Sequence, residues 1–150
     1  MSDDRKLNKK DPRDKAILYA LDQARTELKA NGAIVPFLEI IHEGEVSKEA
    51  YPGVSAVDCF KAASASVTAA CNNAESYVFC YDGYVDMGGK RRDAILAESA
   101  NAGDNVAEVF GVLYTIASDD TSKIAFDDGI YSVGNAASLF MSNAATTAEI

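Results

Sequence analysis

The stretch "YVFCYDGYVDMGGKRRDAILAES", residues 77–99, decides the fold of this 150-residue chain. Residues 76–87 point alternately to two faces, with the period of two that strands have. Two adjacent glycines suit a two-residue hairpin turn, because that turn needs positive φ angles. We therefore predict a β-hairpin in which strand 76–87 turns at Gly88-Gly89 and returns as strand 91–100.

The register of this hairpin follows from the position of its turn. An opposite-charge pair across two strands contributes about 0.2–1 kcal/mol, so Asp86 and Arg91 favour this register. Much of the charge on the hairpin is then explained by register and by a solvated sheet face. The predicted pairs are Met87 with Lys90, Asp86 with Arg91, Val85 with Arg92, Tyr84 with Asp93, Asp82 with Ile95, and Phe79 with Glu98.

Toward the N-terminus, the sequence predicts a helix over residues 12–30. Asp11 is a favourable N-cap, Pro12 suits the first helical position, and Asn31-Gly32 is a typical C-terminal stop. Between these ends the apolar side chains recur at helical spacing, at Ile17, Leu21, Ala24 and Leu28.

Two strands and a second helix are expected next. Residues 33–41 predict a strand, in which Pro36 indicates an edge position or a bulge. Residues 46–51 predict a second, more polar strand. The second helix begins after Ser55, a suitable N-cap with Asp58 three residues later. The apolar stripe of this helix is expected to contain Val57, Phe60, Ser64, Val67 and Cys71.

The C-terminal third predicts further strands. Residues 107–118 indicate a long strand, and residues 123–134 indicate one more strand or a pair broken at Asp127-Asp128-Gly129. The tail is rich in Ala, Ser and Asn and allows a short C-terminal helix. Residues 1–10 and about 141–150 lack a packed apolar pattern and are expected to be flexible.

These elements define a single α+β domain over residues 1–150, in the order α-β-β-α-β-β-β(β). The short connections favour an antiparallel sheet of about five or six strands with two main helices. The order resembles that of roadblock and profilin-like domains. Tyr81-Asp82-Gly83-Tyr84 and Arg92-Asp93-Ala94 also resemble a hairpin of small uncharacterised bacterial α+β proteins. These resemblances imply no activity, because function resides in sites rather than folds.

Charge is distributed unevenly along the chain. The net charge is −9, and residues 16–150 carry nineteen acidic side chains but only eight Lys and Arg. An acidic body repels phosphate backbones, so we expect no binding to nucleic acid.

The compartment is predicted from composition. No run of about eighteen apolar residues is present, and the charged N-terminus lacks the apolar centre of a signal peptide. We therefore expect no membrane association and a cytoplasmic location. Cys59, Cys71 and Cys80 are scattered within apolar patterns and are expected to be buried free thiols.

Two sets of side chains on the hairpin are candidate functional residues. Clustered carboxylates can raise one another's pKa or bind a hard cation. The candidate ligand-binding residues are Asp82, Tyr84, Asp86 and Asp93. The candidate interaction surface is the basic run at the turn, which contains Lys90, Arg91 and Arg92.

Familiar catalytic patterns are absent from the sequence. His42 is the only histidine, so a zinc site built on His and Cys is not predicted. Neither G-x-S-x-G, a phosphate-binding loop, nor G-x-G-x-x-G occurs, which excludes the signals for a nucleophile elbow and for nucleotide cofactors. We predict no cofactor, no metal and no catalytic residue.

Two functions from different classes remain. The leading hypothesis is a non-enzymatic interaction or regulatory module that acts by self-association, as a homodimer, or by binding a protein partner. The alternative is a small-ligand or cation site, which could be hydrolytic, built on the carboxylates and tyrosine of residues 82–93.

Overall fold

The computed structural model describes residues 6–53, 55–70, 73–116 and 123–140. Within these residues the chain is an α+β fold, as the sequence predicts, with an antiparallel sheet and two main helices. In chain order the elements are α1 (Pro12–Asn31), β1 (Phe37–His42), β2 (Glu45–Ala50), α2 (Ala56–Ala69), β3 (Ser76–Met87), β4 (Lys90–Asn101), β5 (Val106–Ile116), β6 (Ile124–Phe126) and β7 (Tyr131–Ala137).

The sheet follows the path β2-β1-β3-β4-β5-β6, and β7 also pairs with β5. Strand β5 has room for both neighbours, because β7 pairs along its first half and β6 pairs with its last three residues. Residues 123–134, predicted to form one strand or a broken pair, therefore form a pair of strands with a break near Asp127-Asp128-Gly129.

The predicted capping residues are confirmed at the ends of α1 and at the start of α2. The Asp11 side chain accepts a hydrogen bond from the Asp14 N–H, and Pro12 is the first helical residue. At the other end of α1, Gly32 is left-handed with a φ of 77°, and its N–H donates to the Leu28 carbonyl. Ser55 caps α2 by accepting from the Asp58 N–H.

Strand β1 begins later than the sequence predicts. It starts at Phe37 rather than at residue 33, so Pro36 lies before the strand and not inside it. Proline has no N–H for the ladder, and at Pro36 only the carbonyl is used, as acceptor from the Tyr51 N–H at 2.9 Å.

The predicted apolar stripe of α2 is correct at Val67 and wrong at Val57 and Phe60. The buried residues are Cys59, Ala63 and Val67, whereas Val57 and Phe60 are 64% and 42% exposed. Small side chains at Cys59 and Ala63 let the helix approach the sheet closely, so these residues face the core instead of the larger ones. Cys71 lies outside the described residues.

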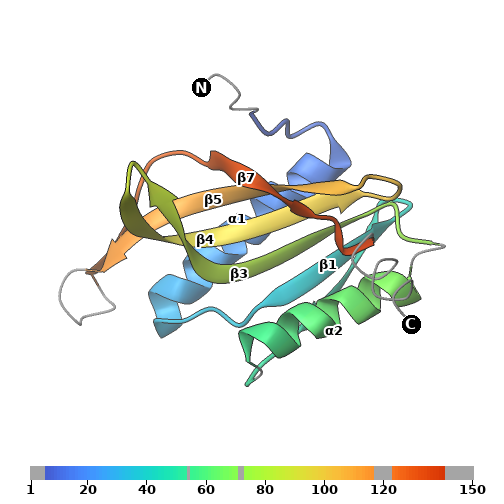
Figure 1. Cartoon of the computed structure of the whole chain (residues 1–150), viewed down its shortest axis with the longest axis horizontal. Coiled ribbons are helices and arrows are strands. Elements are labelled where there is room, and N and C mark those ends of the chain that lie inside the picture. The colour runs from blue at the N-terminus through green and yellow to red at the C-terminus, as the bar shows by residue number, and fades with distance from the viewer. Residues whose placement is uncertain (1–5, 54, 71–72, 117–122, 141–150) are drawn as a thin grey trace.

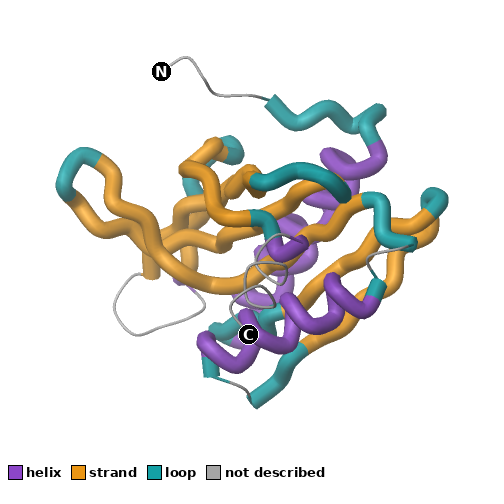
Figure 2. The backbone as a smooth tube through the Cα atoms, turned by 45° about the vertical axis from the view of Figure 1, so that its right-hand side comes forward, coloured by secondary structure: helices purple, strands orange, loops and turns teal. Residues whose placement is uncertain are grey.

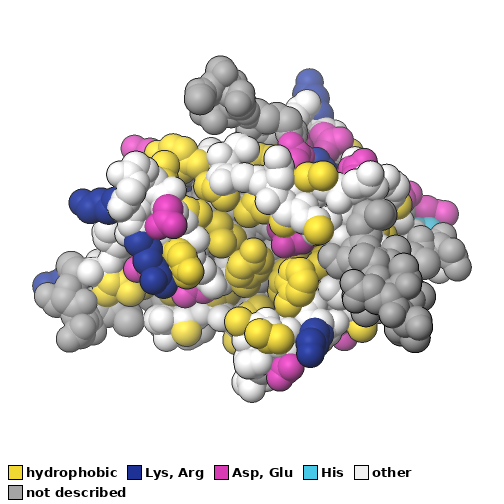
Figure 3. Space-filling model, in the orientation of Figure 1, with side chains coloured by type: hydrophobic (Ala, Val, Ile, Leu, Met, Phe, Trp, Pro, Cys, Tyr) yellow, Lys and Arg dark blue, Asp and Glu magenta, His cyan; other side chains and the backbone are white. Residues whose placement is uncertain are grey.

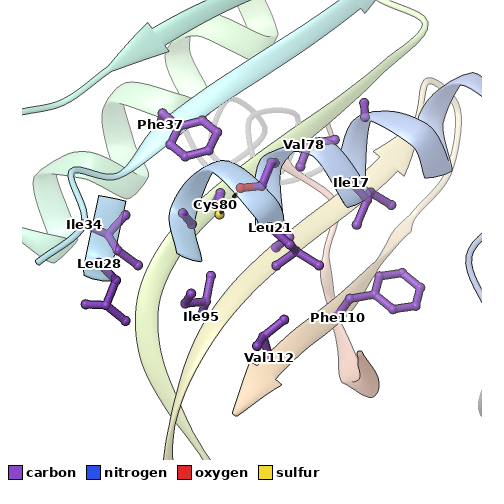
Figure 4. Close-up of a cluster of buried hydrophobic side chains, with 14 of the residues drawn as sticks. Ile17, Leu21, Leu28, Ile34, Phe37, Val78, Cys80, Ile95, Phe110 and Val112 are labelled. Atoms are coloured by element: carbon purple, nitrogen blue, oxygen red, sulfur yellow. Dashed lines mark hydrogen bonds between the residues drawn. The ribbon is translucent and has the colours of Figure 1, made fainter. Parts of the chain in front are cut away.

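The two helices pack on opposite faces of the sheet (Figure 1). We call these the α1 face and the α2 face. On the α1 face the larger core forms, where Ile17 and Leu21 pack with Cys80, Ile95 and other side chains of the central strands (Figure 4). On the α2 face, α2 packs beside β1, and its cluster includes Ala100 of β4 and Ala107 of β5, whereas the cluster around Leu96 and Val109 contains no residue of α2. Figure 2 shows the two helices and the sheet from a second direction.

Cys59 and Cys80 are buried thiols, as predicted. Burial raises the pKa of both thiols, so neither is poised as a nucleophile. The Cys80 thiol donates to the Ala20 carbonyl at 3.9 Å, which ties β3 to α1 (Figure 4). Among the described residues, no helix is both long enough and apolar enough to cross a membrane.

The turn of the hairpin yields a first prediction. Gly88 and Gly89 have φ angles of 62° and 81°, and a Cβ at either position would meet no atom within 4 Å. The cost of Gly89→Val is therefore conformational, and we expect a loss of about 1 kcal/mol or more in unfolding free energy. Urea denaturation measures this loss. Lys90→Val, on the next residue, is the control and should be nearly neutral; equal stability of Gly89→Val and wild type would contradict the prediction.

Candidate functional site

The β3–β4 hairpin has the register that the sequence predicts. All six predicted cross-strand pairs are present, from Met87 with Lys90 at the turn to Phe79 with Glu98 near the sheet centre. Beyond Cys80, strand β3 extends past the end of its pairing with β1. The tip of the hairpin therefore projects away from both helices (Figure 1).

The four candidate ligand-binding residues lie on one face of the hairpin and are exposed. The Asp82 carboxylate accepts a hydrogen bond from the Tyr114 hydroxyl at 2.7 Å. Partial burial raises the pKa of Asp82, and the Asp93 carboxylate adds to this effect. Asp82 and Asp93 therefore form a pair of interacting carboxylates, but Asp82 already accepts a hydrogen bond from Tyr114.

Arg91 contacts Tyr84 rather than Asp86. Its guanidinium lies 3.6 Å from the centre of the Tyr84 ring, which is 51% exposed. In the described part of the chain, the expected ion pair between Asp86 and Arg91 does not form. A cation–π contact takes its place, because the tyrosine lies diagonally opposite on the same face.

The basic run at the turn divides into two parts. Arg92 is partly buried, and its Nη2 lies 3.1 Å from Oδ1 of Asp127, which ties the hairpin to the segment between β6 and β7. Lys90 and Arg91 remain exposed at the tip. Of the predicted interaction surface, these two residues are accessible to a partner.

The described residues hold no group of three or more His, Cys, Asp or Glu side chains arranged to bind a metal ion. His42 ends β1, where its Nε2 lies 3.8 Å from Oε2 of Glu43. The alternative hypothesis of a cation site at residues 82–93 therefore stays a prediction without a converging set of ligands.

An apolar surface that was not predicted from the sequence lies on the α2 face. Four half-buried side chains, Tyr81, Val85, Tyr131 and Val133, pack around the buried residues Leu96 and Val109. No helix of the described chain covers them, and Figure 3 shows apolar side chains gathered across the middle of this face. We call this area, defined by these six residues, the open apolar surface.

An aromatic cluster borders the open apolar surface on the side of α2. The Phe79 ring lies 5.0 Å from Tyr81 and 6.3 Å from Phe60, measured between ring centroids. A cavity of about 270 Å³ opens beside these rings, and Pro36 and Asp82 also line it. The exposed Phe60 thus extends the apolar area onto the helix.

A buried carboxylate lies beneath this face. Glu98 is 2% exposed, and its Oε2 accepts a hydrogen bond from the Tyr77 hydroxyl at 2.8 Å. The same hydroxyl accepts from the Leu139 N–H at 3.0 Å. Burial raises the pKa of Glu98, whereas the bond from Tyr77 opposes that rise. The pair joins β3, β4 and the segment after β7.

In the described residues, the fold is an α+β protein with one helix on each face of the sheet, and part of the α2 face has no helix over it. Comparison with known proteins finds no matching family model, no matching curated protein and no matching solved structure.

Proposed function

We propose that the protein is a non-catalytic interaction module that forms a homodimer through the open apolar surface. The observation that supports this proposal is the group of half-buried apolar side chains that no helix of the described residues covers. Contiguous apolar patches with a polar rim are typical of protein–protein contacts. Covering such area contributes about 25 cal/mol per Å² of apolar surface removed from water.

The hairpin that extends from this surface carries charges of both signs at its tip, and Arg91, Asp86 and Asp93 lie on the strand face opposite Val85. The hairpin tip carries both signs, with Lys90 and Arg91 exposed next to Asp86 and Asp93. In a twofold dimer, if a basic residue of one copy contacts an acidic residue of the other, the reverse contact also forms, so a mixed-charge tip can be complementary to itself. Local complementarity is needed, since two chains of net charge −9 repel one another at long range.

Val85→Asp tests the proposal. A carboxylate at the centre of a desolvated contact is costly, so we expect the dimer to dissociate at least tenfold more readily, by about 1.4 kcal/mol or more. Sedimentation velocity over a concentration series measures the change, and thermal unfolding checks the fold. Val106→Asp is the matched control, since Val106 is 53% exposed on the opposite face.

The expected result is a wild-type dimer, a monomeric Val85→Asp variant with an unchanged melting curve, and a dimeric Val106→Asp variant. A wild-type chain that sediments as a monomer at every concentration would overturn the proposal. So would a Val85→Asp variant that dimerises as well as wild type.

A further inference from the structure

A second cavity lies on the α1 face, between the first turns of α1 and the β1–β2 hairpin. Its volume is about 730 Å³. Helix α1 packs mainly over β3 and β4, whereas every residue of β2 is exposed. The helix therefore does not close over this end of the sheet, and the space between them forms the cavity.

Glu39 lines this cavity, and the residue is 2% exposed. Its Oε1 has no hydrogen-bond partner among the described residues. Burial of a carboxyl without a partner is costly, and burial raises the pKa of Glu39 to about 7. Oε1 of Glu39 is therefore an acceptor for which the described chain supplies no donor.

The nearest basic side chain on the sheet does not fill this role. Lys48 is opposite Glu39 in the β1–β2 register. Its Nζ donates to Oε1 of Gln23 at 3.1 Å and lies 4.3 Å from the centre of the Phe37 ring. Lys48 lowers the pKa of Glu39 through its charge, but it is held by these other contacts.

Three more lysines line the cavity from the N-terminal side, namely Lys9, Lys10 and Lys15. All three are exposed, and none forms an ion pair with a described residue. A basic cluster on a chain of net charge −9 is a local exception. Three ammonium groups together repel cations and attract an anion.

The remaining side chains that line the cavity are apolar, apart from the hydroxyl of Tyr19. On α1 they are Pro12, Ala16 and Tyr19, which share one helix face at spacings of three and four. On the hairpin the wall is Val46. Tyr19 is 58% exposed and Val46 is 51% exposed, so both can be covered by the body of a ligand.

We propose that this cavity binds a small amphiphilic organic anion. The anionic group lies among the three lysines, and an aromatic or aliphatic body packs between Tyr19 and Val46. An amine or hydroxyl of the ligand donates to Glu39. Because the cavity and the open apolar surface lie on opposite faces of the sheet, this inference is independent of the proposed dimer.

The probe for this site is the fluorescent dye toluidinonaphthalene sulfonate, in the isomer with the sulfonate and the secondary amine at opposite ends of the naphthalene. It carries the three chemical groups that the cavity requires. We expect wild-type protein to bind it with enhanced fluorescence. The variant Lys9→Gln/Lys10→Gln/Lys15→Gln should bind about tenfold more weakly, since each exposed charge contact contributes roughly two- to fivefold.

Two controls isolate the charge effect. The variant Lys29→Gln/Lys61→Gln/Lys123→Gln makes the same change of net charge away from the cavity and should bind like wild type. The neutral amine that lacks the sulfonate should bind both triple variants equally. Equal loss of dye affinity in the two triple variants would mean a general charge effect and would overturn the proposal.

Substitutions at Glu39 test the hydrogen bond. Glu39→Leu removes the acceptor and should weaken dye binding several-fold, whereas Glu39→Gln keeps an acceptor oxygen and should restore most of it. Equal binding by these two variants would contradict the role of Glu39. Tyr19→Ala should weaken both the dye and its neutral analogue.

The dye could also bind to the open apolar surface, and Val85→Asp separates the two locations. Binding that survives Val85→Asp and falls in the lysine variant supports the cavity, whether or not the chain dimerises. Binding that is lost in Val85→Asp but retained in the lysine variant places the dye on the opposite face and overturns the proposal.

Discussion

Replacing Tyr77 with Phe is expected to lower the free energy of unfolding by about 2–4 kcal/mol, although only one oxygen atom is removed. The Tyr77 hydroxyl donates to Oε2 of Glu98 at 2.8 Å and accepts from the Leu139 N–H at 3.0 Å. Without it, the carboxyl of Glu98 is buried without this donor, and a buried unsatisfied group costs about 1–3 kcal/mol, or more when charged.

Urea denaturation at pH 8 and at pH 5 measures this effect. The cost should be larger at pH 8, because the lost bond stabilises the ionised form of Glu98, whose pKa is already raised by burial. Tyr81→Phe is the control, since Tyr81 lies on the same face and its hydroxyl has no hydrogen bond to a described residue. It should change stability by less than about 0.5 kcal/mol.

A double-mutant cycle identifies the partner. In a Glu98→Leu background the carboxyl is absent, and Tyr77→Phe should then cost much less than in wild type. An unchanged cost in that background would show that the hydroxyl does not act through Glu98.

Replacing Glu39 with Gln is expected to raise the free energy of unfolding by about 2–3 kcal/mol above pH 7. Burial raises the pKa of Glu39 from 4.5 to about 7, so the folded chain holds the proton more tightly than the unfolded chain. The contribution of Glu39 to stability is complete below pH 4.5 and is lost as the pH rises to about 7. Gln has the same shape and no charge to bury.

The difference in unfolding free energy between Glu39→Gln and wild type should therefore be small at pH 4.5 and grow as the pH rises to about 7. Above that pH it should stay constant. Thermal or urea unfolding over this pH range measures the difference. The contributions of the other buried carboxyls to the pH dependence cancel, because both proteins contain them. Glu45→Gln, on an exposed position of β2, is the control. A constant difference at all pH values would show that Glu39 is not the group that titrates.

A stabilising substitution at Glu39 would also bear on function. Residues that lower stability are retained where a site needs them, and an unsatisfied carboxyl in a cavity is such a residue. Glu39→Gln is expected to stabilise the ligand-free chain, and Glu39→Leu is expected to weaken dye binding. The same carboxyl would then both lower the stability of the fold and contribute to the proposed binding. If substitutions at Glu39 stabilise the chain but do not change dye affinity, the buried charge of Glu39 affects stability alone and has no role in binding.

The strongest sequence signals concerned local structure. Gly88-Gly89 predicted the turn, and with it every pair along the hairpin, because a two-residue turn leaves one register. Asp11, Gly32 and Ser55 marked the helix ends, because capping depends on residues within one turn of each end. These features require no knowledge of the rest of the chain.

The hairpin charges were harder to interpret from the sequence. Arg91 was expected to pair with Asp86 and instead lies over Tyr84, and Arg92 reaches Asp127, which is 35 residues away in the chain. The choice among several neighbouring partners depends on distances that only the folded hairpin and its surroundings supply. The open apolar surface was missed for the same reason, since its strands look like ordinary core strands in the sequence.

The sequence by itself determined the α+β class, the ends of the helices and the register of the hairpin. The tertiary structure decided which side of α2 is buried, which part of the α2 face has no helix of the described residues over it, and that Glu39 lines a cavity together with three lysines. The physical reason is the separation along the chain of the residues that interact. Turns and caps are local, whereas burial depends on which elements, distant in the chain, pack over a given strand, and α1 and α2 each cover only part of a wide sheet.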